Sequence, residues 1–300
     1  MSYRRAVIQL IITALCWAAM FHLGKWVLQQ LPVLELTTWR MLLAALTLGI
    51  WVWLSEGYDW QAIRKNARPL LMMVLLGVVG FNLALYGGLG GSSPVNASLL
   101  MATTPALTAV MSALLLRERL NVQQWLGAGL AFAGVVTVVS RGSWQVLQHL
   151  NLSPADGLIM LAVLGWVSYG VIGRGFVRGM TTLQMTTVTI IAGALGLMGI
   201  SVPAQGLHLP TLPLFAALVV MGVLGVGLTY VWWNQGIKTL GTARATIFIN
   251  LVPVLTCLMG LLLGQVVTGA QWLGMLLVIG GVLLSSRPAP APAGKLALVR

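Results

Sequence analysis

The tetrapeptide Gln124-Trp125-Leu126-Gly127 occurs a second time as Gln271-Trp272-Leu273-Gly274, 147 positions later (271 − 124). Upstream of it, Pro105 is matched by Pro253 at a spacing of 148. Near the start of the chain the spacing is 149, since Trp17, Gly24 and Lys25 are matched in order by Trp166, Gly173 and Arg174. Small loop deletions account for the drift. The chain therefore contains an internal repeat, and we predict its copies at residues 4–141 and 155–287.

The composition is that of an integral membrane protein. Hydrophobic residues make up 58% of the 300 residues, charged residues only 7%, and the mean hydropathy is +0.93. Soluble domains carry about 25% charged residues. Apolar segments continue to the end of the chain, so the first one is predicted to be a mature helix and not a cleaved signal. The net charge of +12 does not indicate nucleic-acid binding, because the basic residues are scattered at the ends of the apolar segments.

Apolar runs of about 18–22 residues are long enough to cross a bilayer as helices. The connections between them are short, which leaves no room for a soluble domain, and the Pro-Ala-rich residues 288–300 are predicted to be a disordered cytoplasmic tail. The fold class is thus an all-α polytopic membrane protein with ten transmembrane helices in two five-helix repeats. The predicted spans are 6–27, 34–54, 69–88, 95–116, 122–140, 156–177, 182–202, 213–236, 242–263 and 269–286.

The distribution of Lys and Arg at the span ends predicts the orientation, because cytoplasmic loops carry an excess of both. With a cytoplasmic N-terminus, three basic residues face the other side, namely Lys25, Arg40 and Arg141. Fourteen fall on the cytoplasmic side: Arg4, Arg5, Arg64, Lys65, Arg68, Arg117, Arg119, Arg174, Arg178, Lys238, Arg244, Arg287, Lys295 and Arg300. Both termini are therefore predicted to be cytoplasmic.

Five helices is an odd number, so the second repeat enters the membrane from the opposite side. Inverted repeats are a hallmark of secondary transporters, which bind substrate near the midplane between the halves. The two halves adopt two different conformations of one fold. When each half takes up the conformation of the other, the transporter changes between its outward-open and inward-open states. Two alternatives to a transporter remain open. The duplication could serve stability alone, and channels also use inverted repeats.

Two stretches give the chain a family resemblance. The first runs Leu15-Cys16-Trp17-Ala18-Ala19 and continues through Lys25, Leu31-Pro32 and Trp39-Arg40-Met41-Leu42-Leu43. The second joins Thr104-Pro105 to Leu116-Arg117-Glu118-Arg119 and to Trp125-Leu126-Gly127. Together with Trp166, Pro253 and Gly274 in the second repeat, they resemble EamA-domain proteins of the drug/metabolite transporter superfamily.

The resemblance implies ten helices in inverted repeats and transport of small metabolites, commonly as efflux, and it suggests a bacterial inner membrane. Two positions depart from the symmetry of the repeat: Arg40 aligns with Thr189, and Glu118 with Gln265. Any role of those charges is therefore confined to the first repeat.

Several residues near the expected midplane are candidates for a substrate cavity. Pro105 and Pro253 each remove a hydrogen bond inside a helix, so they mark either matched interruptions at a binding site or packing kinks. Trp17 and Trp166 are a deep, repeat-related pair that forms either an aromatic cavity wall or core packing. The remaining polar and aromatic candidates are Asn82, Tyr86, Tyr169, Tyr230, Trp233 and Asn250; each Asn alternatively bonds a neighbouring helix.

Charged residues inside spans are expected to be functional. Arg40 lies in the second span, where it is predicted to bind a substrate carboxylate or to hold a gate. His22 and Lys25 lie near the same outer end and are weaker candidates. The competing interpretation is a structural pair between Glu35 and Arg40 or between Glu35 and Lys25, with Lys25 reaching outward.

Other patterns limit the mechanism. None of the five acids, Glu35, Glu56, Asp59, Glu118 and Asp156, lies in the middle third of a span, which argues against a buried carboxylate as proton relay. No phosphate-binding motif, catalytic set or metal-ligand spacing is present in the sequence, so we expect neither an enzyme nor a cofactor. The glycines of the fifth and tenth spans predict a packing seam, within the chain or in a dimer.

We therefore predict a secondary transporter that moves small organic metabolites, such as amino acids or related compounds, outward across the inner membrane by alternating access. Its partners would be the small-molecule substrate and the lipid bilayer, and the protein would be a monomer or a homodimer. A multidrug exporter of aromatic cations is the alternative within transport. From other classes, the alternatives are a membrane-embedded lipid-modifying enzyme and a structural or regulatory subunit.

Overall fold

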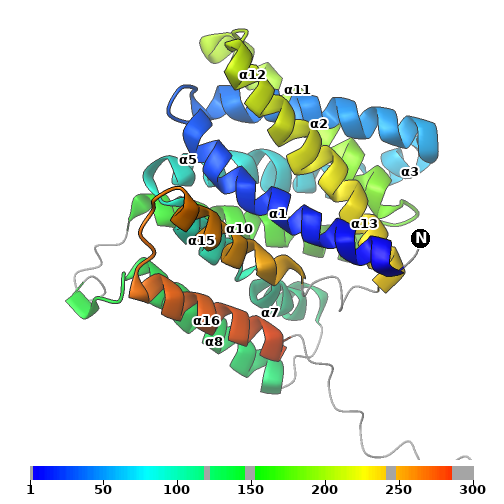
Figure 1. Cartoon of the computed structure of the whole chain (residues 1–300). Coiled ribbons are helices and arrows are strands. Elements are labelled where there is room, and N and C mark those ends of the chain that lie inside the picture. Colours follow the sequence, from blue (N-terminus) through cyan, green and yellow to red (C-terminus); the bar gives the residue numbers. More distant parts are fainter. Residues whose placement is uncertain (1–2, 118–121, 146–152, 241–247, 286–300) are drawn as a thin grey trace, which may run out of the picture.

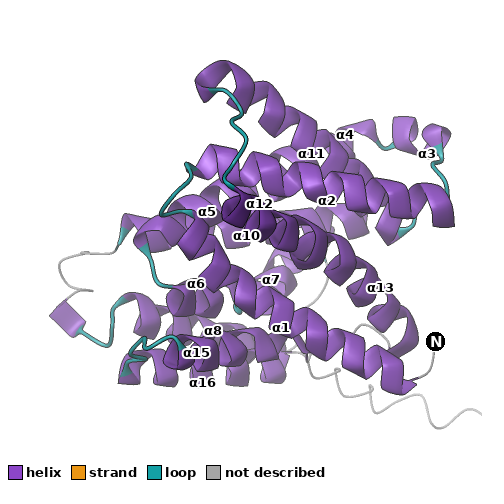
Figure 2. Ribbon diagram, turned by 45° about the horizontal axis from the view of Figure 1, so that its top comes forward, coloured by secondary structure: helices purple, strands orange, loops and turns teal. Residues whose placement is uncertain are grey.

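The computed structural model describes residues 3–117, 122–145, 153–240 and 248–285, and within these ranges all regular structure is helical (Figure 1, Figure 2). In the described part of the chain, seven helices are long and apolar enough to span a membrane, and three apolar helices are shorter. The all-α membrane fold is thereby confirmed, whereas the arrangement of ten spans in two repeats stays a prediction. The tail after residue 287 and Glu118 lie outside the described residues.

The helices of the first half run in the order α1 (Tyr3–Val27), α2 (Val33–Ser55), α3 (Trp60–Lys65), α4 (Ala67–Met72), η1 (Met73–Gly80), α5 (Phe81–Gly91), α6 (Pro94–Met101), α7 (Thr104–Leu116) and α8 (Val122–Val139). The second half contains α10 (Pro154–Phe176), α11 (Thr182–Gln205), α12 (Leu212–Val219), η2 (Val220–Leu228), α13 (Thr229–Leu240), η3 (Phe248–Asn250), α15 (Leu251–Leu262) and α16 (Gly269–Ser285).

Two of the long helices contain a π-helical stretch at corresponding places. η1 separates α4 from α5, and η2 separates α12 from α13. The α-helices that follow begin at Phe81 and Thr229, which are 148 positions apart (229 − 81). Stretches of π-helix are rare and frequently lie at functional sites. Both adjoin the cavity described below.

The repeat-related prolines occupy a different position from the one predicted. Pro105 follows a break between α6 and α7, and Pro253 follows the short η3, so each lies in the first turn of a new helical segment. In a first turn the backbone N–H has no intrahelical acceptor, so the proline costs no helix hydrogen bond. At the first break, the hydroxyls of Thr103 and Thr104 donate to the carbonyls of Leu100 and Met101, at 2.7 and 2.6 Å. The Leu100 carbonyl also accepts the Thr103 N–H at 3.2 Å, so the two hydroxyls add to the hydrogen bonds at the break.

Helix packing pairs corresponding elements of the two halves. α1 packs on α13 and α15, and α10 packs on α5 and α7. α2 packs on α11, and α8 packs on α16, which lie side by side in Figure 1. If the halves are exchanged, α1 takes the place of α10, and α13 and α15 take the places of α5 and α7. These four sets of contacts therefore map onto themselves.

The pair α8 and α16 is held together by a seam of small residues. A Cβ on Gly134 would come within 2.8 Å of the Gly274 carbonyl oxygen, and one on Gly281 within 2.5 Å of the Gly127 carbonyl oxygen. Such distances leave no room for a side chain, and small residues let membrane helices approach this closely. The predicted packing seam is confirmed as one within the chain.

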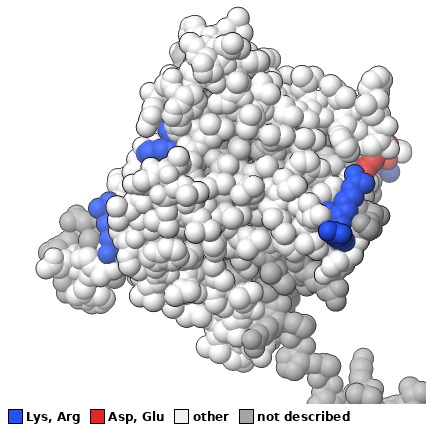
Figure 3. All heavy atoms as spheres, in the orientation of Figure 1, with Lys and Arg blue, Asp and Glu red and all other residues white. Residues whose placement is uncertain are grey.

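The charged side chains lie where a membrane protein requires them. On the face in Figure 3, Lys, Arg, Asp and Glu side chains gather at two opposite edges, and the wide band between them is uncharged. Large apolar side chains on the candidate membrane-spanning helices are exposed, including Leu46, Leu75, Leu161 and Leu195. Exposed apolar surface of this kind marks contact with lipid or with another protein.

Candidate functional site

A cavity of about 220 Å³ opens among the helices of both halves. The first half contributes side chains from α1, α2, α5, α6 and α7, and the second half from α10, η2, α13, η3 and α15. Apolar and aromatic side chains predominate in its wall. The lining residues are Trp17, Met20, Phe21, Arg40, Phe81, Leu85, Tyr86, Leu89, Ser98, Met101, Ala102, Thr104, Trp166, Gly225, Tyr230, Trp233, Ile249, Val252 and Pro253.

The aromatic part of the wall is one continuous cluster. Trp17 contacts Trp233 and Tyr230, with ring centroids 5.5 and 6.4 Å apart. Tyr230 in turn contacts Trp166, at 6.0 Å, and Trp166 stacks on Tyr169 at 5.7 Å. The sequence leaves open whether Trp17 and Trp166 form a cavity wall or core packing, and this placement favours the cavity wall. Both rings line the cavity, and Tyr230 lies between them.

Symmetry explains how the two tryptophans are positioned. The indole N–H of Trp17 donates to the hydroxyl of Thr229 at 3.2 Å, while Trp166 packs on Phe81 at a centroid distance of 5.2 Å. Phe81 and Thr229 begin the corresponding helices α5 and α13. Each tryptophan therefore rests on the helix that follows the π-helical stretch of the opposite half.

Among the described residues, Arg40 is the one positively charged side chain in the lining, and it is almost fully buried, with 8% of its surface exposed. One Nη1 N–H donates to the Asn82 side-chain oxygen at 2.5 Å, and the guanidinium lies 5.3 Å from the centre of the Tyr86 ring. Its Nε, also buried, has no hydrogen-bond partner. Among the described residues, no carboxylate forms an ion pair with it.

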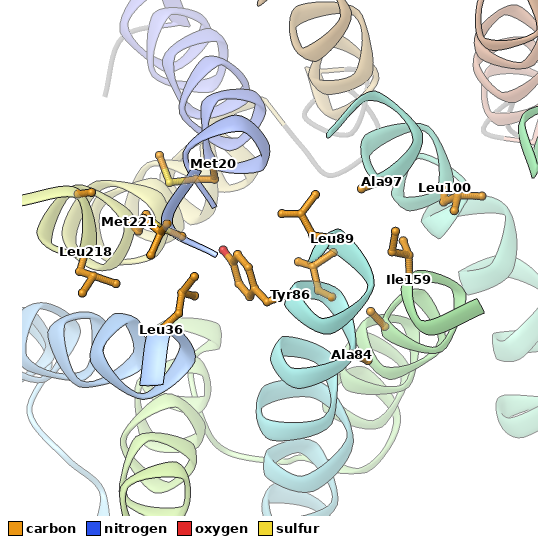
Figure 4. Close-up of a cluster of buried hydrophobic side chains, with 14 of the residues drawn as sticks. Met20, Leu36, Ala84, Tyr86, Leu89, Ala97, Leu100, Ile159, Leu218 and Met221 are labelled. Carbon is orange, nitrogen blue, oxygen red and sulfur yellow. The ribbon is translucent and has the colours of Figure 1, made fainter. Parts of the chain in front are cut away.

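Tyr86 and Asn82 are themselves fixed by packing. Figure 4 shows Tyr86 pointing from α5 toward Met20, Leu36 and Met221, with which it shares a buried cluster. The Asn82 amide donates to the Val78 carbonyl at 2.7 Å, which leaves the amide oxygen aimed at Arg40. Both residues therefore hold the guanidinium in one orientation.

A smaller chamber of about 30 Å³ adjoins the cavity and shares Arg40, Phe81, Trp166 and Tyr230 with it. Its polar wall is completed by Asn82, Tyr169 and Thr186. The Tyr169 hydroxyl lies 3.1 Å from the hydroxyl of Thr189, the residue that corresponds to Arg40 in the second half. A neutral cluster of hydroxyls thus stands where the first half has a charge.

Four predicted site residues line neither space, namely Pro105, Asn250, His22 and Lys25. Pro105 directly follows Thr104, which lines the larger cavity. Asn250 is buried in η3, and its side-chain oxygen has no partner among the described residues. The Nε2–H of His22 donates to the Thr256 carbonyl at 2.9 Å and thereby joins α1 to α15.

Lys25 has a structural position. Its ammonium donates to the carbonyls of Leu89, Gly90 and Ser92, at 2.9, 2.7 and 3.0 Å. These carbonyls end α5, where a cation is favoured by the helix dipole. Lys25 therefore fastens the end of α1 to the end of α5, outside the cavity.

The acids make other contacts than the predicted ones. Glu35 is buried beside His208, with 3.9 Å between the carboxylate and the ring nitrogen, and pairs with neither Arg40 nor Lys25. Asp156 is also buried, in the first turn of α10, and accepts a hydrogen bond from the Ser92 hydroxyl at 2.5 Å. Neither acid lines the cavity.

Sequence reasoning missed several lining residues, among them Met20, Phe21, Phe81 and Ser98. A signal existed for Met20, which corresponds to Tyr169 at the repeat spacing of 149 (169 − 20). A Cβ on Gly225 would come within 2.5 Å of Met20, and one on Gly77 within 2.4 Å of Tyr169. The two side chains thus fill equivalent places against equivalent glycines.

A family model for EamA-like transporters matches residues 4–140 and 153–287, which together make up most of the sequence. The chain belongs to the EamA-like transporter family. The resemblance inferred from the sequence motifs is thereby confirmed. This EamA-like chain is a membrane transporter, and the cavity lies where its helices from both matched segments meet.

Curated relatives cover the EamA-like chain almost completely. It is 34% identical to the uncharacterized transporter YyaM of Bacillus subtilis, over 95% of each chain. It is 26% identical to a probable terminal-alkyne amino-acid exporter of Streptantibioticus cattleyicolor, over 96% of this chain and 95% of that one. A solved crystal structure with 22% identity superposes with a TM-score of 0.67, covering 95% and 98% of the two chains. At that identity the likeness concerns the fold alone.

Proposed function

We propose that this transporter exports small organic metabolites, amino acids or related compounds, by alternating access of two inverted five-helix repeats. The cavity built by both halves around Arg40 is the observation that carries the proposal. A substrate bound there would contact both repeats at once, so a change in their relative tilt would expose it to one side and then the other.

Three further observations support the inverted repeat. The family model matches two segments of the chain, 4–140 and 153–287. The main contacts of α1 and α10, of α2 with α11 and of α8 with α16 map onto themselves when the halves are exchanged. The π-helical stretches η1 and η2 precede helices that begin 148 positions apart. One ancestral five-helix unit, used twice in opposite orientations, accounts for all three.

The proposed location is the inner membrane with both termini in the cytoplasm. The asymmetry of Lys and Arg between the two sets of loops supports this orientation. We further propose that the protein is not an enzyme. The described residues contain no group of three metal-ligating side chains, and the cavity wall offers one cation but no general base.

Efflux from intact cells tests the proposal. Cells that overproduce the protein are compared with cells carrying an empty vector, and the medium is analysed for all small metabolites. We expect a small set of organic acids or amino acids to accumulate outside only with the protein. Trp17→Ala, which removes part of the cavity wall, should abolish the accumulation, whereas Gly129→Ala, an exposed position facing open space, should preserve it. Identical media from all strains would contradict the proposal.

Export of aromatic cations is a second candidate, favoured by the cluster of Trp17, Trp166, Tyr230 and Trp233. Aromatic faces attract cations within about 6 Å of the ring centroid. The Arg40 charge works against this candidate because it repels a cation in the same cavity. Resistance to ethidium conferred by the protein, and strengthened by Arg40→Gln, would favour the second candidate over the first.

A further inference from the structure

We propose that the cavity recognises its substrate through a single carboxylate, so that a monoanion with an aromatic or branched apolar body binds more tightly than the zwitterion or the cation with the same body. This inference rests on the proposed function and specifies its substrate class. It places the carboxylate against Arg40 and the body against the aromatic cluster.

The electrostatic state of Arg40 is the first argument. A guanidinium that is 8% exposed and has no carboxylate partner in the described part of the chain carries a large desolvation cost. Asn82 and the Tyr86 face offset part of that cost with dipole and quadrupole interactions. A full negative charge is still missing, and the buried Nε is a donor without an acceptor. A carboxylate bound in the cavity beside Arg40 would supply that charge.

The shape of the site is the second argument. The chamber of about 30 Å³ beside Arg40 has room for roughly two or three water-sized groups, which is the size of a carboxylate. The cavity of about 220 Å³ has room for roughly 15 to 20 such groups. The shared lining residues Arg40, Phe81, Trp166 and Tyr230 lie between the two spaces. A polar head and a much larger apolar body therefore fit in different compartments.

The lack of an anionic partner for an ammonium group is the third argument. Among the described residues, no Asp or Glu lines the cavity. The hydroxyls in the wall, those of Tyr86, Ser98, Thr104 and Tyr230, are neutral and offer an ammonium lone pairs but no negative charge. Aromatic faces attract a cation, but by less than it costs to desolvate one. An amine on the substrate thus adds a cost that the cavity does not offset.

A matched ligand series tests the inference on the unmodified protein. Purified full-length protein in detergent is titrated with 3-phenylpropanoate, phenylalanine and 2-phenylethylamine, which share a phenyl ring and differ in charge. Binding is measured by calorimetry. We expect 3-phenylpropanoate to bind about ten-fold or more tightly than phenylalanine, because phenylalanine must also bury an ammonium that the cavity does not pair with a negative charge. The amine should show no measurable binding.

Variants identify the residue responsible. Arg40→Gln should lower the affinity for 3-phenylpropanoate at least about ten-fold, and Arg40→Lys should retain part of it, because the charge remains. Gly129→Ala should bind as the unmodified protein does. If Arg40→Gln elutes as an aggregate, the comparison of the three compounds on the unmodified protein still tests the inference.

Three results would overturn the inference. They are equal or tighter binding of phenylalanine or of the amine, unchanged carboxylate affinity in a folded Arg40→Gln protein, and binding of none of the three compounds. In each case the efflux experiment still decides the proposed function, because it does not presuppose a substrate.

Discussion

At the scale of single residues, the site depends on how one charge is held. Arg40 reaches the cavity from α2 while Asn82 and Tyr86, four positions apart on α5, meet it from the other side. In the second half the corresponding residues are Thr189, Tyr230 and Asn234, at spacings of 149 and 148. The amide and the phenol have exchanged places, and the charge is absent. The anion-binding chemistry is therefore specific to the first half.

A double-mutant cycle tests the coupling between Arg40 and Asn82. Asn82→Leu leaves a buried guanidinium N–H without its acceptor, so we expect a loss of about 1–3 kcal/mol in stability. Arg40→Met combined with Asn82→Leu should recover most of that loss, since apolar side chains replace a buried polar pair at little cost. Unfolding midpoints in detergent give both values. A double variant that loses the sum of the single losses would refute the coupling.

Lys25 provides a second residue-scale prediction. Lys25→Met removes three hydrogen bonds to the carbonyls that end α5, so amide hydrogen exchange should become faster around residues 89–93. Lys25→Arg keeps the charge and donors and should change exchange much less. Because Lys25 lies outside the cavity, neither variant should alter ligand affinity. Unchanged exchange in Lys25→Met would show that the contacts do not hold the helix end.

At the scale of elements, the sequence predicts the helices better than their interruptions. Among the described residues, seven of the predicted spans are helices long and apolar enough to cross a membrane, because the apolar length that lipid requires can be recognised in a sequence. The π-helical stretches η1 and η2 were not predicted, since their Gly- and Val-rich sequences fit an α-helix equally well. Pro105 correctly marked an interrupted helix. It does not remove a helix hydrogen bond, however, because a break two residues earlier places it in a first turn.

The same limits apply to the site. Trp17, Trp166 and Arg40 could be predicted from repeat symmetry and from the rarity of charge inside a span. His22 and Lys25 share the outer end of that span, yet both satisfy backbone carbonyls elsewhere. Only the three-dimensional contacts distinguish a charge that faces a cavity from one that ends a helix.

The seam between α8 and α16 yields an element-scale prediction. Gly134→Ala places a methyl group within 2.8–2.9 Å of α16 backbone atoms, so the helices must separate. We expect a loss of about 1–3 kcal/mol, typical of overpacking. Gly129→Ala, on the same helix with nothing within 4 Å, should cause no loss. Thermal unfolding in detergent compares the pair. Equal midpoints for the two variants would exclude the seam as a stabilising contact.

At the scale of the whole molecule, the orientation can be tested with two cysteine variants in a protein that lacks Cys16 and Cys257. Gln145→Cys lies in a predicted outer loop and Gln61→Cys in a predicted cytoplasmic one, and both positions are exposed. A membrane-impermeant maleimide added to intact cells should label the first and not the second. Labelling of residue 61 alone would invert the proposed topology.

The central claim is that one cavity between the two halves opens alternately to each side of the membrane. Ala102 lines that cavity and is 3% exposed, so Ala102→Cys in the cysteine-free protein reports access to it with little change in volume. The measurement is the rate of its modification by an impermeant thiol reagent, in right-side-out and in inside-out vesicles. We predict modification from both sides, slowed on both by a bound substrate. Modification from one side only, whether or not substrate is present, would contradict alternating access.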